Sequence, residues 1–584
     1  MIILSPDSIM QSLAFNPKKF EIALNDDLTS LSVSKPSSSS HTISNPASPS
    51  ANIDSSIAAI NRLPVEILSH IFIALVRHLS DPGMDDLQEG QRAVLVSHTC
   101  AHWRNIALSC PFLWTTVDTR LHPALRGLFI ERSATLPMRL NVTRLDGDDF
   151  LHIISQQLSR LREVHTNRDF PHARILELME LLAQSAPMLE VLELECDWYK
   201  HRGPLSPHDL VLDRSAPLLK ALYLDCFYPP SVTSLTHLTL RCCFYDRPDV
   251  ARLLNFLEQN PRLEVLHIVA TDDMWLGVQD PGSHRPVVRL EHLRSVSFKS
   301  CLESFIRILL TYLVFPATTL VRLESDEVDD FLRGARSLFP RDASPLRFLH
   351  TPKFLQIQQT SSDFQYLGGD ETTAFSVKLR ALDDGFILRR SFISLLSWRM
   401  TDCVQELWLG PKLEFRGALK DWLIVGEQWR QIFLGFPALR VLSLPVEAGN
   451  SMHVLDALTP VDGDAQAMLC PNLTTLHIYR ITTQPSDSFD ALSRFVSARA
   501  RHGHPIHHLH FHVSERFGPE HRQWCALPED EEAITESRDQ GQRRCAHEVT
   551  WDADLECVPT AFAVVKSRLE AGEKHDDDPE WYLV

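Results

Sequence analysis

The residue types best suited to metal or proton chemistry gather near the C-terminal end of the sequence. The segment ARHGHPIHHLHFHV contains six histidines: His502, His504, His507, His508, His510 and His512. If this segment ends in a strand with Leu509 and Phe511 turned inward, three of the histidines share the opposite face. Imidazoles grouped in this way can hold a metal ion. No cysteine or carboxylate stands at a ligand spacing, so a partner-contacting or solvated face is the alternative interpretation. We expect no bound metal and no other cofactor.

The other residues able to do chemistry form no catalytic motif. The sequence contains no phosphate-binding loop, no dinucleotide-binding glycine pattern, no zinc-protease motif and no serine-nucleophile motif. The acidic pairs Asp329/Asp330 and Asp383/Asp384 fall in expected loops and are interpreted as solvated charges. The twelve cysteines include no C-x-x-C pair, which indicates small apolar residues in a reducing compartment. We therefore expect a protein that is not an enzyme.

Charge and hydropathy limit the classes of partner. The 584 residues include 57 basic and 75 acidic side chains, giving a formal charge of −18. This balance argues against binding to nucleic-acid backbones, which requires basic surfaces. No apolar run reaches the length of a membrane span, and the first residues lack the basic region of a signal peptide. The expected location is the cytoplasm, the nucleus or both, with no membrane partner.

The two ends of the chain differ in composition from the rest. Residues 1–56 are rich in serine and proline and contain too few apolar side chains to form a core, so we predict a disordered leader. Residues 516–584 carry runs of acidic residues, and we predict a partly disordered tail there. Within that tail, Val549–Trp551 could cover the last unit of the preceding domain.

The elements that position the histidines belong to a repeat. The six-residue pattern apolar-x-x-apolar-x-apolar recurs at spacings of about thirty residues, typical of a leucine-rich repeat. Segments with helical periodicity lie between several of these patterns and begin near His172, Asp249, Glu303 and Ser486. The patterns begin at Leu189, Leu219, Leu235, Leu263, Leu293, Leu320, Leu346, Val404, Leu439, Leu473 and Ile506, with a weak candidate at Ala374.

A strand followed by a helix cannot bury its apolar face alone, but stacked copies share one core. Residues 119–515 are therefore predicted to form a degenerate leucine-rich-repeat α/β solenoid, a horseshoe with a parallel sheet on its concave face. Long loops are expected at Thr271–Val287 and Gln358–Thr373. A set of unrelated α/β domains with leucine-rich strands is the alternative.

The same pattern predicts a binding surface. The residue between the last two apolar positions should face the concave side, opposite the core. Aromatic side chains on such a face are typical of interfaces. The competing interpretation of the tryptophan in this set is burial under a loop. The predicted substrate-contacting residues are Tyr223, His267, Trp408, His477 and His510.

Short amphipathic helices precede the repeats. Leu63-Pro64 opens the first, since proline suits the first helical position, and Glu66 follows in the first turn. Apolar residues from Ile67 to Leu75 make one broad face. A second helix is expected from about Val94 to Pro111.

These residues carry a resemblance. The patterns Leu-Pro-x-Glu-Ile-Leu-x-x-Ile-Phe from Leu63, Cys-x-x-Trp-Arg-x-x-Ala from Cys100 and Pro-x-Leu-Trp from Pro111 resemble the F-box proteins abundant in fungi. The resemblance implies a helical domain over 57–118 that docks on the Skp adaptor of cullin-RING ubiquitin ligases. The connection over 76–93 is longer than the short turn of a compact F-box. The implied adaptor-contacting residues are Leu63, Pro64, Ile67, Leu68, Ile71, Phe72, Val96, Cys100 and Trp103.

The function that follows is substrate recognition in a Skp-cullin-F-box ubiquitin ligase. The helical domain would bind the adaptor, and through it a cullin, while the solenoid binds a protein substrate. Three alternatives stay open: an ordinary helical hairpin packed on its own chain, an interaction scaffold without ligase partners, and a metal-dependent enzyme that uses the His502–His512 cluster.

Overall fold

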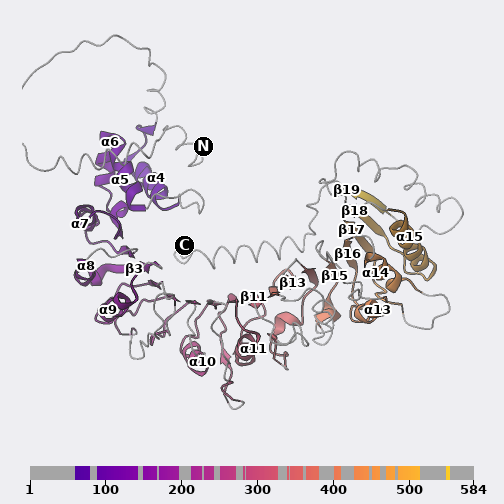
Figure 1. Cartoon of the computed structure of the whole chain (residues 1–584). Helices are drawn as coiled ribbons and strands as arrows, with labels where there is room; N and C mark the ends of the chain where they lie inside the picture. Colours follow the sequence, from indigo (N-terminus) through magenta and orange to yellow (C-terminus); the bar gives the residue numbers. More distant parts are fainter. Residues whose placement is uncertain are drawn as a thin grey trace, which may run out of the picture. The chain divides into compact units, whose positions relative to one another are not determined.

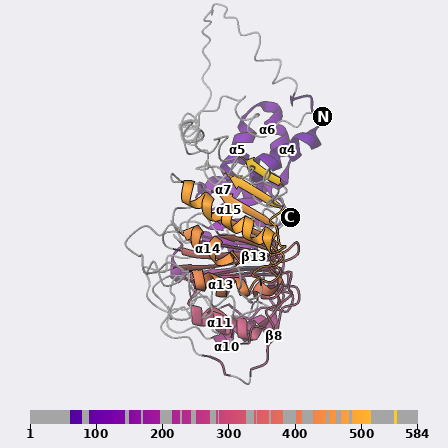
Figure 2. The ribbon, with the colours of Figure 1, turned by 90° about the vertical axis from the view of Figure 1, so that its right-hand side faces the viewer.

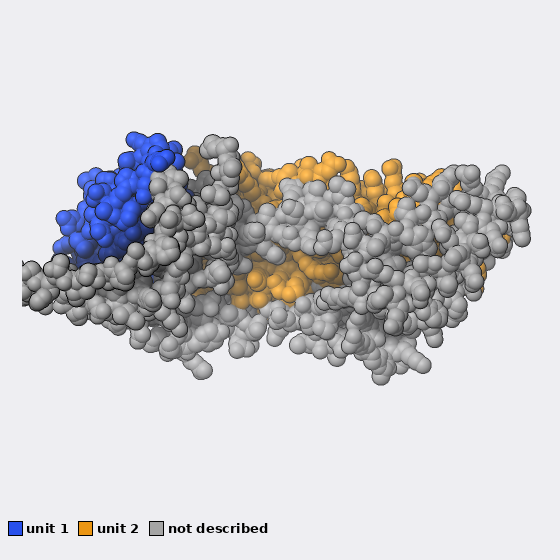
Figure 3. All heavy atoms as spheres, turned by 90° about the horizontal axis from the view of Figure 1, so that it is seen from above, with its two compact units in different colours: residues 1–167 blue, residues 168–584 orange. Residues whose placement is uncertain are grey.

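The computed structural model divides into two compact units, residues 1–167 and 168–584 (Figure 1, Figure 3). The expected leader lies outside the described residues, as does the expected tail except for one strand. The structure describes residues 60–78, 89–142, 149–167, 170–195, 212, 214–225, 229–241, 250–270, 280–282, 285–325, 338–340, 342–359, 363–380, 400–409, 426–445, 450–460, 468–479, 485–512 and 548–552.

The first unit begins with helix α4 (Val65–His78). The helix starts one residue later than expected. Pro64 directly precedes it, and the Pro64 carbonyl accepts the first helical hydrogen bond, from the Leu68 N–H at 3.1 Å. The inner face of α4 is buried at Leu68 and Phe72. The Phe72 ring packs on Trp103 with ring centroids 4.8 Å apart, and the Trp103 indole donates to the Asn61 side chain at 2.9 Å. The segment before α4 is thereby attached to the helical core.

The second predicted helix is wrong in one respect, because the chain forms two helices there. They are α5 (Glu89–His98) and α6 (Ala101–Leu108), followed by the 3-10 turn η1 (Pro111–Trp114). Thr99 Oγ1 donates to the Leu95 carbonyl at 3.1 Å, so the side chain competes with the backbone for the end of α5. Cys100 is extended, and its sulfur accepts from the Trp103 N–H at 3.4 Å. The single predicted helix is thus interrupted at Thr99 and Cys100.

The first unit continues as a small α/β arrangement. Its strands β1 (Thr116–Asp118), β2 (Met138–Val142) and β3 (Leu161–Thr166) pair in parallel in sequence order. Helices α7 (Pro123–Arg132) and α8 (Asp149–Gln157) and the 3-10 turn η2 (Leu158–Arg160) connect them. Trp114 joins the two parts: its indole donates to the Ala107 carbonyl at 2.8 Å, and its ring meets Phe129 edge-on at 4.9 Å.

The second unit opens with parallel strands in sequence order. They are β4 (Val191–Leu194), β5 (Ala221–Asp225), β6 (His237–Arg241), β7 (Val265–Val269), β9 (Ser295–Lys299) and β11 (Leu320–Ser325). Every strand coincides with a predicted repeat pattern. Helices α9 (His172–Leu182), α10 (Val250–Gln259) and α11 (Glu303–Tyr312) also occur where periodicity predicts them. A second, two-stranded sheet pairs β8 (Val288–Arg289) with β10 (Leu313–Val314).

The centre of this unit departs from the repeat. The pattern at Leu346 forms a 3-10 turn, η5 (Arg347–Leu349), where a strand was expected. The expected loop Gln358–Thr373 is also wrong, because β12 (Phe354–Gln359), β13 (Asp363–Gly369) and β14 (Ala374–Arg380) form an antiparallel meander. Strand β14 pairs with β11 and β12 pairs with β15, both in parallel. The three strands of the meander therefore lie between β11 and β15 in the reverse of their sequence order, β14, β13, β12.

Two glycines and an aspartate explain the tight β13–β14 turn. Gly369 has a φ of +155°, a conformation that side chains disfavour. A Cβ on Gly368 would stand 2.3 Å from the Phe375 ring, so only glycine allows that ring its position. The Asp370 carboxylate accepts from the N–H groups of Thr372 and Thr373, both at 2.7 Å. Burial opposes ionisation of Asp370, but these hydrogen bonds outweigh it and lower the pKa of the carboxyl.

Parallel strands in sequence order resume after the meander. They are β15 (Glu406–Leu409), which follows the 3-10 turn η6 (Met400–Cys403), β16 (Val441–Pro445), β17 (Thr475–Tyr479), β18 (His508–His512) and β19 (Glu548–Asp552). Helices α13 (Gly426–Leu434), α14 (Asn450–Leu458) and α15 (Pro485–Arg501) belong to this series. Strand β19 extends the sheet at the segment expected to cover it.

The helices α10, α11, α13, α14 and α15 lie on one side of the sheet of the second unit (Figure 1, Figure 2). We call the opposite side its open face. Among the described strands the large sheet is mainly parallel and does not close into a barrel, so the expected mixed α/β class is confirmed. No described helix has both the length and the apolar character needed to cross a lipid bilayer. Most of the expected loop Thr271–Val287 lies outside the described residues.

Candidate interaction surfaces

The start of α4 exposes an apolar surface, which we call the α4 patch: Leu63, Pro64, Val65 and Ile67. The exposed fractions of its aliphatic side chains are 37% for Leu63, 47% for Val65 and 47% for Ile67. Single exposed apolar residues are common, but four within five positions are not. The buried face of the same helix already packs on Trp103 through Phe72. The α4 patch therefore serves no core among the described residues.

The structure separates the nine predicted adaptor-contacting residues into two groups. Leu63, Pro64 and Ile67 are exposed in the α4 patch, and Ile71 is half-buried. Val65 completes the patch, although the sequence reasoning missed it; its position directly after Leu-Pro was the available signal. The remaining five hold the helices together as core or capping residues: Leu68, Phe72, Val96, Cys100 and Trp103.

A second surface lies on the open face, across β15 to β18. The register places Trp408 beside Ser443, Ser443 beside His477, and His477 beside His510. The ring centroids of Trp408 and His477 are 5.9 Å apart, and those of His477 and His510 are 4.5 Å apart with an interplanar angle of 15°. Trp408 and His477 are two strands apart, so their rings lean together over Ser443, which is fully buried. We call Trp408, His477 and His510 the ring row.

Trp408 is half-buried and rests on a small apolar cluster. The cluster contains Phe354, Leu367 and Ala374 from the three strands of the meander. The Trp408 indole N–H donates to Glu406 Oε1 at 2.9 Å. The meander, which the sequence reasoning missed, therefore supports one end of the ring row.

Tyr223 and His267 do not belong to this surface. They lie on β5 and β7, and their exposed fractions are only 7% and 3%. The expectation that they form an exposed strip with Trp408 is wrong. Tyr223 packs with Val191 and Ala221. Neighbouring strands are about 4.8 Å apart, so side chains of medium size cover one another on this face.

Replacing Tyr223 with serine should lower the stability of the protein. The change removes a buried ring from its contacts with Val191 and Ala221, which we expect to cost about 3 kcal/mol. Tyr223→Phe keeps the ring and should retain most of that stability. Urea unfolding of both variants measures the difference; equal midpoints for Tyr223→Ser and the unchanged protein would contradict the burial.

The histidines of the cluster whose burial the structure describes are exposed or half-buried, and two of them contact backbone carbonyls. A ring nitrogen of His502 lies 2.9 Å from the Ala498 carbonyl, and one of His504 lies 3.0 Å from the Pro471 carbonyl. His508 and His510 stack on β18 with centroids 6.3 Å apart. Within the described ranges, no three His, Cys, Asp or Glu side chains are grouped so as to hold a metal ion. The acidic pairs at 329–330 and 383–384 lie outside those ranges.

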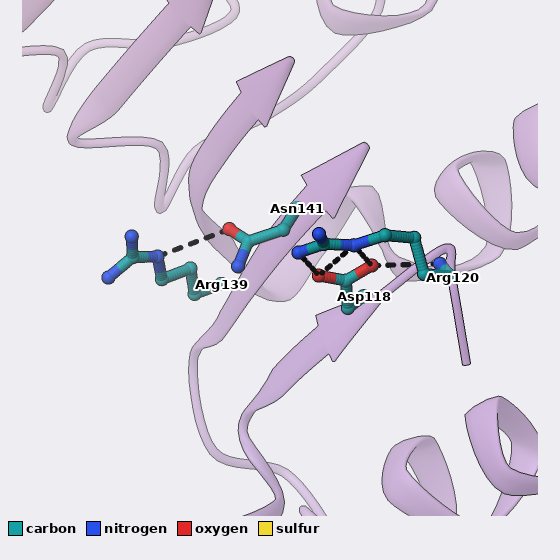
Figure 4. A network of polar contacts seen from close by, with 4 residues as sticks. All are labelled: Asp118, Arg120, Arg139 and Asn141. Atoms are coloured by element: carbon teal, nitrogen blue, oxygen red, sulfur yellow. Dashed lines mark hydrogen bonds and ion pairs between the residues drawn. The ribbon is translucent and has the colours of Figure 1, made fainter. Parts of the chain in front are cut away.

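The sheet of the first unit carries a polar network (Figure 4). The buried Asp118 carboxylate accepts from the Arg120 N–H at 2.8 Å and from its guanidinium at 2.9 Å. Arg139 donates to Asn141 at 3.3 Å and lies 3.7 Å from Glu163. Burial opposes ionisation of Glu163, but a hydrogen bond with His165 and the charge of Arg139 outweigh it and lower the pKa of the carboxyl. The carboxylates of Asp118 and Glu163 thus each have a basic partner nearby, as expected of residues that stabilise the fold.

Comparison with known proteins adds no relative: no protein-family model and no curated protein matches this sequence.

Proposed function

We propose that this protein is the substrate-recognition adaptor of a Skp-cullin-F-box ubiquitin ligase. Helices α4, α5 and α6 act as the F-box, which binds a Skp-type adaptor and through it a cullin. The second unit acts as a degenerate leucine-rich-repeat solenoid whose open face binds a protein substrate in the cytoplasm or nucleus. The ubiquitin transfer itself belongs to other subunits.

The observation that carries the proposal is the α4 patch. An F-box must do two things with one short helix: pack against its own neighbours and present apolar side chains to the adaptor. Helix α4 and the two residues before it divide in this way, since Leu68 and Phe72 are buried while Leu63, Val65 and Ile67 are exposed. These side chains provide the apolar anchors that a specific protein interface requires.

Two features of the second unit support the solenoid. Strands β4, β5, β6, β7, β9 and β11, and strands β15 to β18, each follow the repeat pattern and pair in parallel, and helices lie on one side. Buried side chains also bridge neighbouring repeats. The Asn260 side chain, at the end of α10, accepts from the Leu235 N–H at 3.1 Å and donates to the Val232 carbonyl at 2.8 Å. Such links require stacked units of similar geometry, as in a repeat protein.

Affinity purification of the tagged full chain from extract, with the proteasome blocked, tests the proposal. We expect a Skp-type adaptor and a cullin in the eluate, together with proteins that disappear when the proteasome is active. Recovery of other proteins without adaptor or cullin would favour an interaction scaffold. The long connection between α4 and α5 is the feature that favours this second candidate.

A further inference from the structure

Beside Trp408 lies a carboxylate, Glu406, that forms no ion pair with any residue the structure describes. Glu406 lies on the same face of β15 and accepts the Trp408 indole N–H at 2.9 Å. Burial raises the pKa of the Glu406 carboxyl, and the hydrogen bond from Trp408 opposes the rise only in part. No lysine or arginine in the described part of the chain forms an ion pair with it; the pairs found join other residues. A cationic group from a partner would offset the cost of burying the Glu406 carboxylate in its charged form.

Two further polar atoms beside Trp408 have no hydrogen-bond partner in the part of the chain that the structure describes. Gln356 lies opposite Trp408 on β12, and Ser443 lies opposite it on β16. Both residues are more than nine-tenths buried, and neither Gln356 Oε1 nor Ser443 Oγ has a partner among the described residues. Buried polar atoms are nearly always paired, so an unpaired acceptor here favours a ligand that brings donors.

The ring row limits what that ligand can be. Its half-buried rings offer flat surfaces next to acceptors and a carboxylate, so a matching group is flat, cationic and rich in N–H donors. An arginine guanidinium has all three properties: five donors in a plane, a permanent charge and a face that stacks on aromatic rings. Phosphate groups lack donors at neutral pH and would be repelled by Glu406. The formal charge of −18 adds a general attraction for basic partners.

We propose that the ring row, Glu406 and Gln356 together bind an arginine side chain of a basic peptide segment in a partner protein. The guanidinium stacks on Trp408 and donates to Glu406 and Gln356. The identification of that partner as a ligase substrate rests on the proposed function; the arginine specificity does not. Lysine fits less well, because its ammonium is a point charge without a stacking face.

Peptide binding to the full chain tests the inference. The probes are fluorescein-labelled Gly/Ser peptides with arginine at alternate positions, and matched peptides with citrulline or lysine. Citrulline keeps the flat shape and loses the charge. We expect the arginine peptide to bind about tenfold or more tighter than the citrulline peptide, about 1.4 kcal/mol, with lysine in between. Equal binding of the arginine and citrulline peptides would overturn the proposal.

Two variants, with one matched control, test which residues bind the guanidinium. Glu406→Gln should abolish the preference for arginine over citrulline, while Glu427→Gln makes the same change at an exposed position of helix α13 and should keep it. Gln356→Met removes the unpaired acceptor at similar volume, so it should weaken arginine binding without lowering the melting temperature. An unchanged preference in both Glu406→Gln and Gln356→Met would also overturn the proposal.

The outcome is separable from the ligase proposal. Adaptor capture depends on the first unit, so Glu406→Gln should still purify with the Skp-type adaptor. Arginine-specific binding by a chain that captures no adaptor would leave this inference standing and refute the proposed function. Adaptor capture without arginine preference would do the reverse.

Discussion

Replacing Leu63 and Ile67 together with alanine is expected to abolish capture of the Skp-type adaptor by the full chain. Both side chains are exposed in the α4 patch and contribute to no core among the described residues. Truncating an anchor at the centre of an interface typically costs about 2 kcal/mol or more, so the pair should weaken binding by about a thousandfold. Titration of the purified adaptor measures this change.

Two controls separate the α4 patch from the helical core. Leu434→Ala changes an even more exposed leucine on α13 in the second unit and should leave capture unchanged. Leu68→Ala, one residue beyond Ile67, removes a fully buried side chain and should cost about 3 kcal/mol of stability. If the Leu63/Ile67 double variant captures adaptor at the unchanged level, the α4 patch is not the docking surface.

Replacing Arg499 with methionine is expected to destabilise the second unit more than any surface change. Arg499 lies near the end of α15 with an exposed fraction of 0%, and its guanidinium donates to the carbonyls of Leu469 at 3.0 Å and Cys470 at 2.9 Å. Burial lowers the pKa of Arg499 to about 10, so the side chain remains charged at neutral pH. Cys470 has a left-handed φ of 45°, a costly conformation that these bonds help to hold.

Methionine cannot donate to these carbonyls, so the substitution leaves buried acceptors unpaired. We expect a loss of about 3–5 kcal/mol in the free energy of unfolding, read from the urea midpoint. Arg494→Met, on the same helix, is the matched control: Arg494 is exposed and lies 3.7 Å from Asp456, so its loss should cost less than about 1 kcal/mol. Similar midpoints for the two variants would show that Arg499 does not hold the turn before β17.

Local periodicity was sufficient to predict most elements of the second unit. The repeat pattern predicted strands such as β5 and β16, and the apolar stripe predicted helices such as α10. These predictions succeed because the alternation of side chains in a strand, and the 3.6-residue repeat of a helix, depend only on the segment itself. The meander was missed because its signal is the turn chemistry of Gly369 and Asp370, which the repeat pattern does not include.

The sequence by itself determined the mixed α/β class, the helical segment around Leu63-Pro64 and the placement of the ring row on one face of the strands. Only the tertiary structure decided which of these residues are accessible. Exposure depends on neighbours from distant parts of the chain: Val191 covers Tyr223, whereas Trp408 and His477 lean together above the small Ser443. The same reason explains why Ile67 is exposed and the adjacent Leu68 is buried, since Phe72 and Trp103 establish the inner face of α4.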